Sequence, residues 1–150
     1  MEEIQKQQLY KGKGGEIIRT AICHFIHAIS QAGLHLETPE LMSIFGTIKE
    51  NLKHTNSEIQ DVATNAMQSF CLSYFKDEIS SRVLITELMS MVKASMYDDN
   101  ISVTRGFNMA FGVLSTHVLE RDNLYLTLIR SLMQNCLPKK KESDDAETRK

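Results

Sequence analysis

The sequence predicts an all-α protein built as a HEAT/armadillo-type helical-repeat solenoid of about six main helices. Apolar residues recur at i, i+3, i+4 and i+7 in six segments, which is typical of helices with one buried face. The chain has only two prolines and seven glycines, too few for the turns of an all-β fold. Equivalent apolar residues return after 42 and 44 residues, which matches the ~40–47-residue period of HEAT and armadillo arrays.

The first two strong helices are predicted over residues 16–31 and from about residue 39. Gly33 is expected to stop the first helix, and Thr38 is expected to cap the second with Pro39 at its first helical position. The first apolar face is Ile17, Ile18, Ala21, Ile22, Phe25, Ile26 and Ile29. The second apolar face is Leu41, Ile44, Phe45, Ile48 and Leu52.

Four more helices follow. Asn56 or Ser57 is expected to cap the third, whose apolar face is Ile59, Val62, Ala63, Ala66, Met67, Phe70 and Tyr74. The fourth, over 82–96, carries Ile85, Leu88, Met89, Val92 and Met96. Residues 98–100 are expected to break the fourth helix and to offer a cap for the fifth, which begins near Ile101 and carries Val103, Phe107, Phe111, Leu114 and Val118. The sixth, over 124–136, carries Tyr125, Leu128, Ile129, Leu132, Met133 and Cys136.

A common register links three of these helices. Its members, four residues apart within each helix, are Ile17, Ala21 and Phe25, then Ile59, Ala63 and Met67, then Val103, Phe107 and Phe111. The other three helices start near residues 39, 82 and 124. In such arrays each helix pair buries its apolar face only by stacking on neighbouring pairs. An irregular helical bundle is the alternative, and it would show the same stripes without the shared register.

The predicted domain organisation has three parts. Residues 1–15 are expected to form a short polar helix and a Gly-rich linker, 16–137 the HEAT-like repeat domain, and 138–150 a disordered charged tail. Solenoids usually end in repeats with a polar outer face. The helix over 124–136 lacks one, so its apolar residues would lie partly bare. A piece of a longer repeat protein, a truncated product or a self-associating chain would explain this.

Composition excludes several classes of protein. With 17 Lys and Arg against 19 Asp and Glu, the net charge is −2, which argues against a nucleic-acid-binding protein. No stretch approaches 18 consecutive apolar residues, so we expect no membrane span. Residues 1–15 lack the apolar core of a secretory signal. The three scattered cysteines, Cys23, Cys71 and Cys136, are expected to be reduced and buried, which favours the cytoplasm.

Motifs for chemistry are weak. Cys23 and His27 could supply half of a zinc site, but no CxxC or HxxxH pair provides the other ligands. Residues 12–15 lack the spacing of a phosphate loop, and no serine lies in a GxSxG elbow or has an evident histidine partner. We therefore predict no enzyme, no metal and no cofactor.

What remains is a binding surface on the three register-matched helices, with an ordinary solvated helix face as the alternative for any single residue. Their residues outside the apolar stripe are polar but lightly charged, as a protein–protein surface requires. The candidate partner-binding residues are Arg19, His27, Gln60, Asn65, Gln68, Arg105 and Asn108.

Three segments carry a resemblance to a known family. GEIIRTAICHFI at 15–26 is similar to the GE-[LI]-[VI]-R-T-A-[VI]-C run of the tubulin-folding cofactor D (tubulin-specific chaperone D) family. EIQDVATNAMQSFCLSYF at 58–75 and RGFNMAFGVLSTHVLERD at 105–122 resemble later helices of that family in the same order. The resemblance covers roughly residues 9–136.

The resemblance implies a function in tubulin assembly. Members of the family are large HEAT-repeat proteins that bind β-tubulin. They work with cofactors C and E and an ADP-ribosylation-factor-like small GTPase to make and take apart the αβ-tubulin heterodimer, and the assembly stimulates GTP hydrolysis by tubulin. The chain would then be a C-terminal part or short relative of such a protein, cytoplasmic or microtubule-associated. The family's larger solenoid is not matched, and a generic HEAT-repeat scaffold with an unrelated protein partner is the alternative.

Overall fold

The fold of the chain is entirely helical over the residues that the computed structural model describes, 14–76 and 78–136. This confirms the predicted all-α class. The expected polar helix near the start and the expected charged tail lie outside these residues. The helices are α2 (Gly15–Gln31), α3 (Thr38–Leu52), α4 (Ser57–Tyr74), α5 (Glu78–Tyr97), α6 (Ile101–Gly112), α7 (Thr116–Leu119), the 3₁₀ turn η1 (Arg121–Asn123) and α8 (Leu124–Cys136).

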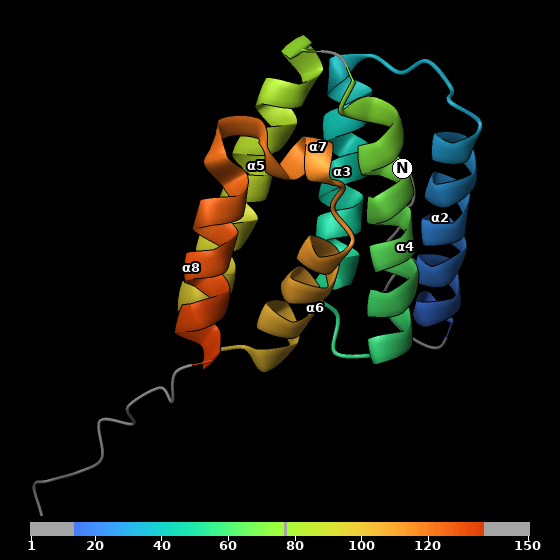
Figure 1. Ribbon diagram of the computed structural model, residues 1–150. Coiled ribbons are helices and arrows are strands. Elements are labelled where there is room, and N and C mark those ends of the chain that lie inside the picture. The colour runs from blue at the N-terminus through green and yellow to red at the C-terminus, as the bar shows by residue number, and fades with distance from the viewer. Residues whose placement is uncertain (1–13, 77, 137–150) are drawn as a thin grey trace, which may run out of the picture.

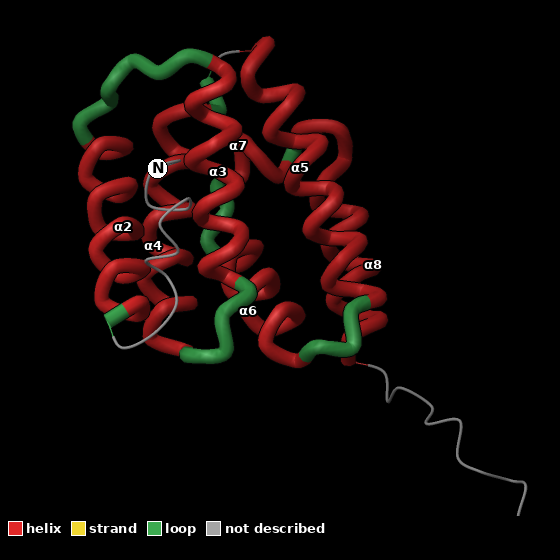
Figure 2. Tube along the Cα trace, turned by 180° about the vertical axis from the view of Figure 1, so that it is seen from behind, coloured by secondary structure: helices red, strands yellow, loops and turns green. Residues whose placement is uncertain are grey.

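The long helices form two rows that run in opposite directions (Figures 1 and 2). α4 packs against α2 on one side and α6 on the other, and these three helices run the same way. α3, α5 and α8 follow one another in the second row and run the other way, with α8 packed chiefly on α5. Consecutive long helices therefore alternate between rows, which is a repeat-like arrangement consistent with the predicted register.

Most helix ends follow the sequence signals. Gly33 adopts a left-handed conformation (φ +65°), and the amides of Gly33 and Leu34 donate to the carbonyls of Ser30 and Ile29, as in a Schellman motif. Asn56 and Asn100 cap α4 and α6, each accepting a backbone N–H from two residues ahead. These caps satisfy amides that a helix start leaves without an intrahelical partner.

The start of α3 corrects a predicted cap. Thr38 is the first helical residue, not the cap, and Glu37 precedes it in an extended conformation. The Glu37 amide donates to Oε2 of Glu40 at 2.8 Å, which is half of a capping box. Pro39 therefore sits one position further into the helix than expected, where it still displaces no intrahelical hydrogen bond.

Two helices differ in extent from their predictions. α5 begins at Glu78 and also buries Leu84 and Met91, because it lies between α6 on one side and α8 on the other. α6 ends at Gly112 instead of continuing towards Val118, which lies on the short α7. Glycine is a poor helix former, and the next two amides close the helix with tighter i→i−3 bonds.

The core confirms the predicted faces of the inner helices. Every predicted apolar residue of α3 is buried, and the rings of Phe45 and Phe70 meet between α3 and α4 with centroids 6.0 Å apart. The register positions are buried on both α4 and α6, from 0% exposed at Met67 to 7% at Val103. The shared register therefore marks core residues in these two helices.

The outer faces of α2 and α8 are exposed. Ile17 and Phe25, expected in the core, are 76% and 63% exposed, because α2 is buried only on the side that meets α4 and α3. On α8 only part of the predicted stripe is buried. Leu128 is buried, whereas Ile129 and Met133 are 50% and 65% exposed, as the expectation of a partly bare helix requires.

Candidate functional site

A narrow row of exposed side chains runs along α4 between α2 and α6. Asp61, Asn65, Gln68 and Leu72 are exposed at i, i+4, i+7 and i+11, which places them on one face of the helix. We call this set the α4 stripe. Two predicted partner-binding residues, Asn65 and Gln68, belong to it. Leu72 was missed because it was counted as neither polar nor core, although its spacing from Asp61 places it on the same face.

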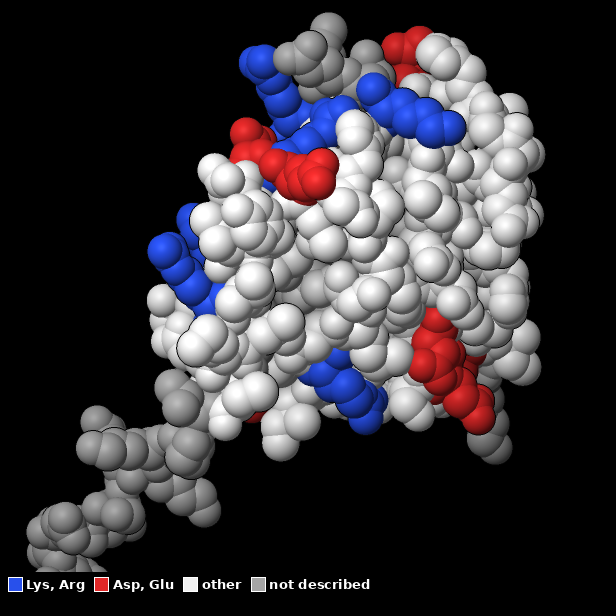
Figure 3. Space-filling model, viewed as in Figure 1, with Lys and Arg blue, Asp and Glu red and all other residues white. Residues whose placement is uncertain are grey.

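The surface around the α4 stripe is lightly charged. In the space-filling view, most charged side chains lie towards the two ends of the helices, and further basic side chains lie at the left edge, where α8 runs. An uncharged area lies between them (Figure 3). Depletion of charge in the centre of a surface is a property of protein–protein interfaces. The uncharged area on this face therefore has the low charge that is found in the centre of protein–protein interfaces.

Gln60 belongs to the interior and not to this surface. Its side chain is 0% exposed, and its Nε2 donates to the carbonyls of Leu52 at the end of α3 and Ser102 at the start of α6, both at 2.7 Å. The residue thus links three helices. The sequence prediction placed it outside because a buried glutamine cannot be distinguished from an exposed one by periodicity alone.

Arg105 and Gly106 complete this three-helix junction. Arg105 is exposed, and its Nε donates to Oε1 of Gln60 at 2.6 Å while Nη2 donates to the Thr55 carbonyl at 3.0 Å. A Cβ at Gly106 would collide with the Leu52 carbonyl oxygen and with Nε2 of Gln60. The close approach of α6 to α3 therefore requires glycine here, next to the Phe107 that fills the core.

The remaining predicted site residues are half-buried. Arg19 donates from Nη1 to Oδ1 of Asn51 on α3 at 2.8 Å. His27 approaches the Asn65 carbonyl at 3.4 Å. Oδ1 of Asn108 is buried and, among the described residues, has no hydrogen-bond partner. Of the seven predicted residues, the structure exposes Asn65, Gln68 and Arg105, and it brings His27 beside Asn65.

His27 gives one serine a histidine partner that was not evident in the sequence. The Ser69 hydroxyl lies 2.7 Å from Nδ1 of His27, a pair that sequence could not reveal because the two residues are 42 positions apart. Ser69 is buried, and the neighbouring Ser73 hydroxyl donates to the Ser30 carbonyl at 2.6 Å. Both hydroxyls form hydrogen bonds between α4 and α2. The pair is therefore a link between helices in which the serine is buried.

Two of the three cysteines are buried thiols. Burial raises the pKa of Cys23 to about 11, although Arg19 and a hydrogen bond with Asn51 act in the opposite direction. Burial also raises the pKa of Cys71. Both thiols are therefore protonated at neutral pH. Cys136 is exposed on α8, which corrects its predicted burial.

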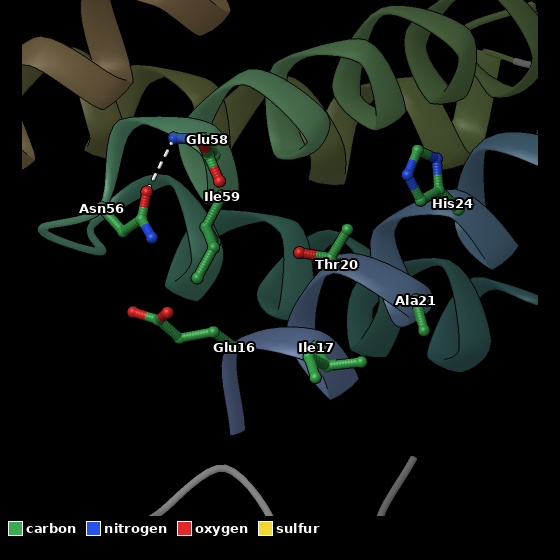
Figure 4. A pocket seen from close by; sticks show the side chains of 8 residues that line it. All are labelled: Glu16, Ile17, Thr20, Ala21, His24, Asn56, Glu58 and Ile59. Atoms are coloured by element: carbon green, nitrogen blue, oxygen red, sulfur yellow. Dashed lines mark hydrogen bonds between the residues drawn. The ribbon is translucent and has the colours of Figure 1, made fainter. Parts of the chain in front are cut away.

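An open groove of about 380 Å³ lies where α2 meets the start of α4. Ile17, Thr20 and Ala21 of α2 face it from one side, with His24 at its far end, and Ile59 lies on the opposite side (Figure 4). Glu16 and Glu58 border it, and the Glu58 amide donates to the Asn56 cap at 2.9 Å. The groove therefore combines apolar lining residues (Ile17, Ala21 and Ile59) with two acidic residues, Glu16 and Glu58, at its border.

The described residues hold no group of three or more His, Cys, Asp or Glu side chains that could bind a metal ion. None of their helices is both long enough and apolar enough to cross a membrane. Together the fold and the α4 stripe define an all-helical, repeat-like protein. No family model and no solved structure matches the chain.

Proposed function

We propose that this chain is a HEAT-type protein-binding module that acts in tubulin folding, as a relative or segment of tubulin-folding cofactor D. The observation that supports binding is the α4 stripe, an exposed and almost uncharged row flanked by parallel helices. The three segments that resemble the family form α4, which carries this stripe, α2 and α6, which pack on either side of α4, and the short α7.

The partner in this proposal is β-tubulin, or one of the fellow cofactors C and E or the small GTPase. Asn65 and Gln68 offer amide donors and acceptors, Leu72 adds apolar area, and Arg105 lies on the next helix of the row. Such a mixture of amide, aliphatic and arginine side chains suits a protein surface. The module would hold its partner by contact and would act in the cytoplasm or on microtubules.

Co-elution with purified αβ-tubulin on a sizing column tests the proposal. A stoichiometric shifted peak is expected, and the variant Asn65→Arg/Gln68→Arg should abolish it, because two added cations disrupt the uncharged centre of the surface. Ser43→Arg on α3 is the matched control, since Ser43 is exposed on the opposite row. Arg19 and Arg105 are unsuitable for this test because both are bonded within the fold.

The co-elution experiment distinguishes a tubulin-binding module from a general helical-repeat scaffold. Binding that both variants leave unchanged would contradict the α4 stripe as the contact. No binding to tubulin by a folded chain would favour the alternative, a general helical-repeat scaffold that uses the same surface for another protein.

A further inference from the structure

Two exposed apolar faces stand apart from the α4 stripe. The α2 face consists of Ile17, Ala21 and Phe25, with Ile17 76% and Phe25 63% exposed. The α8 face consists of Tyr125, Ile129, Leu132 and Met133, between 41% and 65% exposed. Single exposed apolar residues are ordinary on a protein surface. Here, however, they follow one face of each helix, which is typical of a contact surface.

The α2 face is equivalent to residues that are covered elsewhere in the same molecule. Its three positions correspond to Ile59, Ala63 and Met67 on α4, which are at most 1% exposed, and to Val103, Phe107 and Phe111 on α6, which are at most 7% exposed. In α4 and α6 this face is covered by neighbouring helices. The α2 face therefore has the composition of a helix-covered surface.

The α8 face shows the same relation to α5. Leu84, Leu88 and Met91 of α5 are buried, and so are Leu124, Leu128 and Ser131, each 40 residues further on. A second set of α5 residues, Ile85, Met89 and Val92, also packs in the core. The residues 40 positions after them on α8 are Tyr125, Ile129 and Leu132, which are exposed. α8 thus buries one of the two faces that α5 buries and leaves the other exposed.

The order of the rows indicates what fits beyond α8. Each second-row helix, α3 or α5, is followed by an antiparallel first-row helix, α4 or α6 (Figure 1). A helix that covers the α8 face should therefore belong to the first row and run antiparallel to α8. α2 of another copy meets both conditions, and it carries a face of its own that is uncovered.

Charges beside the two faces are complementary. Arg130 is the only charged residue of α8; it is exposed, one helical turn from Leu126 and Met133. Glu16 and Glu58 border the groove that Ile17 and Ala21 line on the α2 side. A basic residue beside one face and two acidic residues beside the other favour contact between unlike faces, because like faces would bring like charges together.

We propose that a second copy of this chain is the occupant: the α8 face of one copy docks on the α2 face of the next, head to tail. Because the two surfaces differ, each docked copy leaves one free face of each kind. Such heterologous contacts form open stacks, or rings where the rotation between copies closes, and in neither case a symmetric dimer. The α4 stripe belongs to neither of the two faces.

Sedimentation equilibrium of the full chain over a wide concentration range tests this proposal. The average mass should rise with concentration beyond that of a dimer. Phe25→Glu and Ile129→Glu should each weaken association at least ~10-fold, since a carboxylate would be buried in an apolar contact. Ile101→Glu on α6, at a position 82% exposed and outside both faces, is the matched control and should associate like the parent.

Mixing the Phe25→Glu and Ile129→Glu chains tests whether the contact is head to tail. The Phe25→Glu chain keeps its α8 face and the Ile129→Glu chain keeps its α2 face, so the mixture should form a 1:1 pair that grows no further. A Phe25→Glu chain that dimerises alone would overturn the proposal in favour of a symmetric α8 contact. A parent chain that stays monomeric at every concentration would overturn self-association itself.

A charge variant keeps the test independent of the apolar substitutions. Arg130→Glu changes an exposed side chain, so the fold should be retained, and association should weaken several-fold and be partly restored on mixing with Glu58→Lys. Unchanged association in Arg130→Glu, together with unchanged association in Ile129→Glu, would overturn the assignment of the α8 face.

Discussion

α2 and α6 carry the same apolar register and meet opposite surroundings. Phe111 of α6 is 6% exposed in the core, while the equivalent Phe25 of α2 is 63% exposed. Both helices are amphipathic, and both carry a phenylalanine at the last register position. Burial of a register position is therefore decided by whether a neighbouring helix covers it, which is how stability is distributed in stacked repeats.

The same substitution at the two phenylalanines gives the largest contrast. Phe111→Ala should lower the free energy of unfolding by about 3–5 kcal/mol, because it removes a buried ring and leaves a cavity. Phe25→Ala should change it by less than ~0.5 kcal/mol, because an exposed site has little packing to lose. Urea unfolding of dilute protein measures both. Equal losses at the two sites would contradict the exposure of the α2 face.

A second pair of substitutions compares a buried glutamine of α4 with a glutamine of the α4 stripe. Gln60→Ala should cost about 2–3 kcal/mol, since it removes the donor to two carbonyls and the acceptor for Arg105 within a buried junction. Gln68→Ala, at an exposed position on the same helix, should cost less than ~0.5 kcal/mol. Thermal unfolding of the two variants distinguishes a structural glutamine from a surface one.

The last comparison concerns the buried side of α2, where the effect on stability is absent at neutral pH. Burial raises the pKa of Cys23 from 9.0 to about 11, so the folded state holds this proton more tightly than the unfolded state. The resulting stability is complete below pH 9 and is lost as the pH rises towards 11, at ~1.4 kcal/mol per pH unit at most.

Urea unfolding at several pH values between 9 and 11 measures this slope. Cys23→Ala should reduce it and Cys136→Ala, at an exposed thiol, should not. A remaining slope of the same sign is expected from Cys71, whose pKa burial also raises. Identical slopes in the parent and Cys23→Ala would show that Cys23 is not desolvated in the fold.

Much of the fold could be predicted from periodicity and caps. The six main helices, the stop at Gly33 and the caps at Asn56 and Asn100 all depend on local signals, and all of them occur. The second buried side of α5 could not be predicted, because it depends on the packing of α8. The exposure of the α2 face could not be predicted either, because an apolar stripe does not reveal whether a neighbouring helix covers it.

The candidate site was predictable only in part for a related reason. Asn65 and Gln68 alternate with core residues at helical spacing, so the pattern places them outside. Gln60 interrupts an apolar face, and only the carbonyls of Leu52 and Ser102 explain a buried amide there. The partner of His27, Ser69, is one repeat away in sequence, and contacts of that kind require the three-dimensional arrangement.

The links between helices have a consequence for how the chain folds. Arg19 bonds to Asn51, His27 to Ser69, Gln60 to Ser102 and Arg105 to Thr55, across separations of 32 to 50 residues. Ser95 and Ser131, 36 residues apart, meet at 3.0 Å between α5 and α8. Each link closes a loop of about one repeat, and short loops cost less entropy to close. Folding can therefore start at any helix pair and spread to the next, and α8 can open while α2 and α4 stay joined.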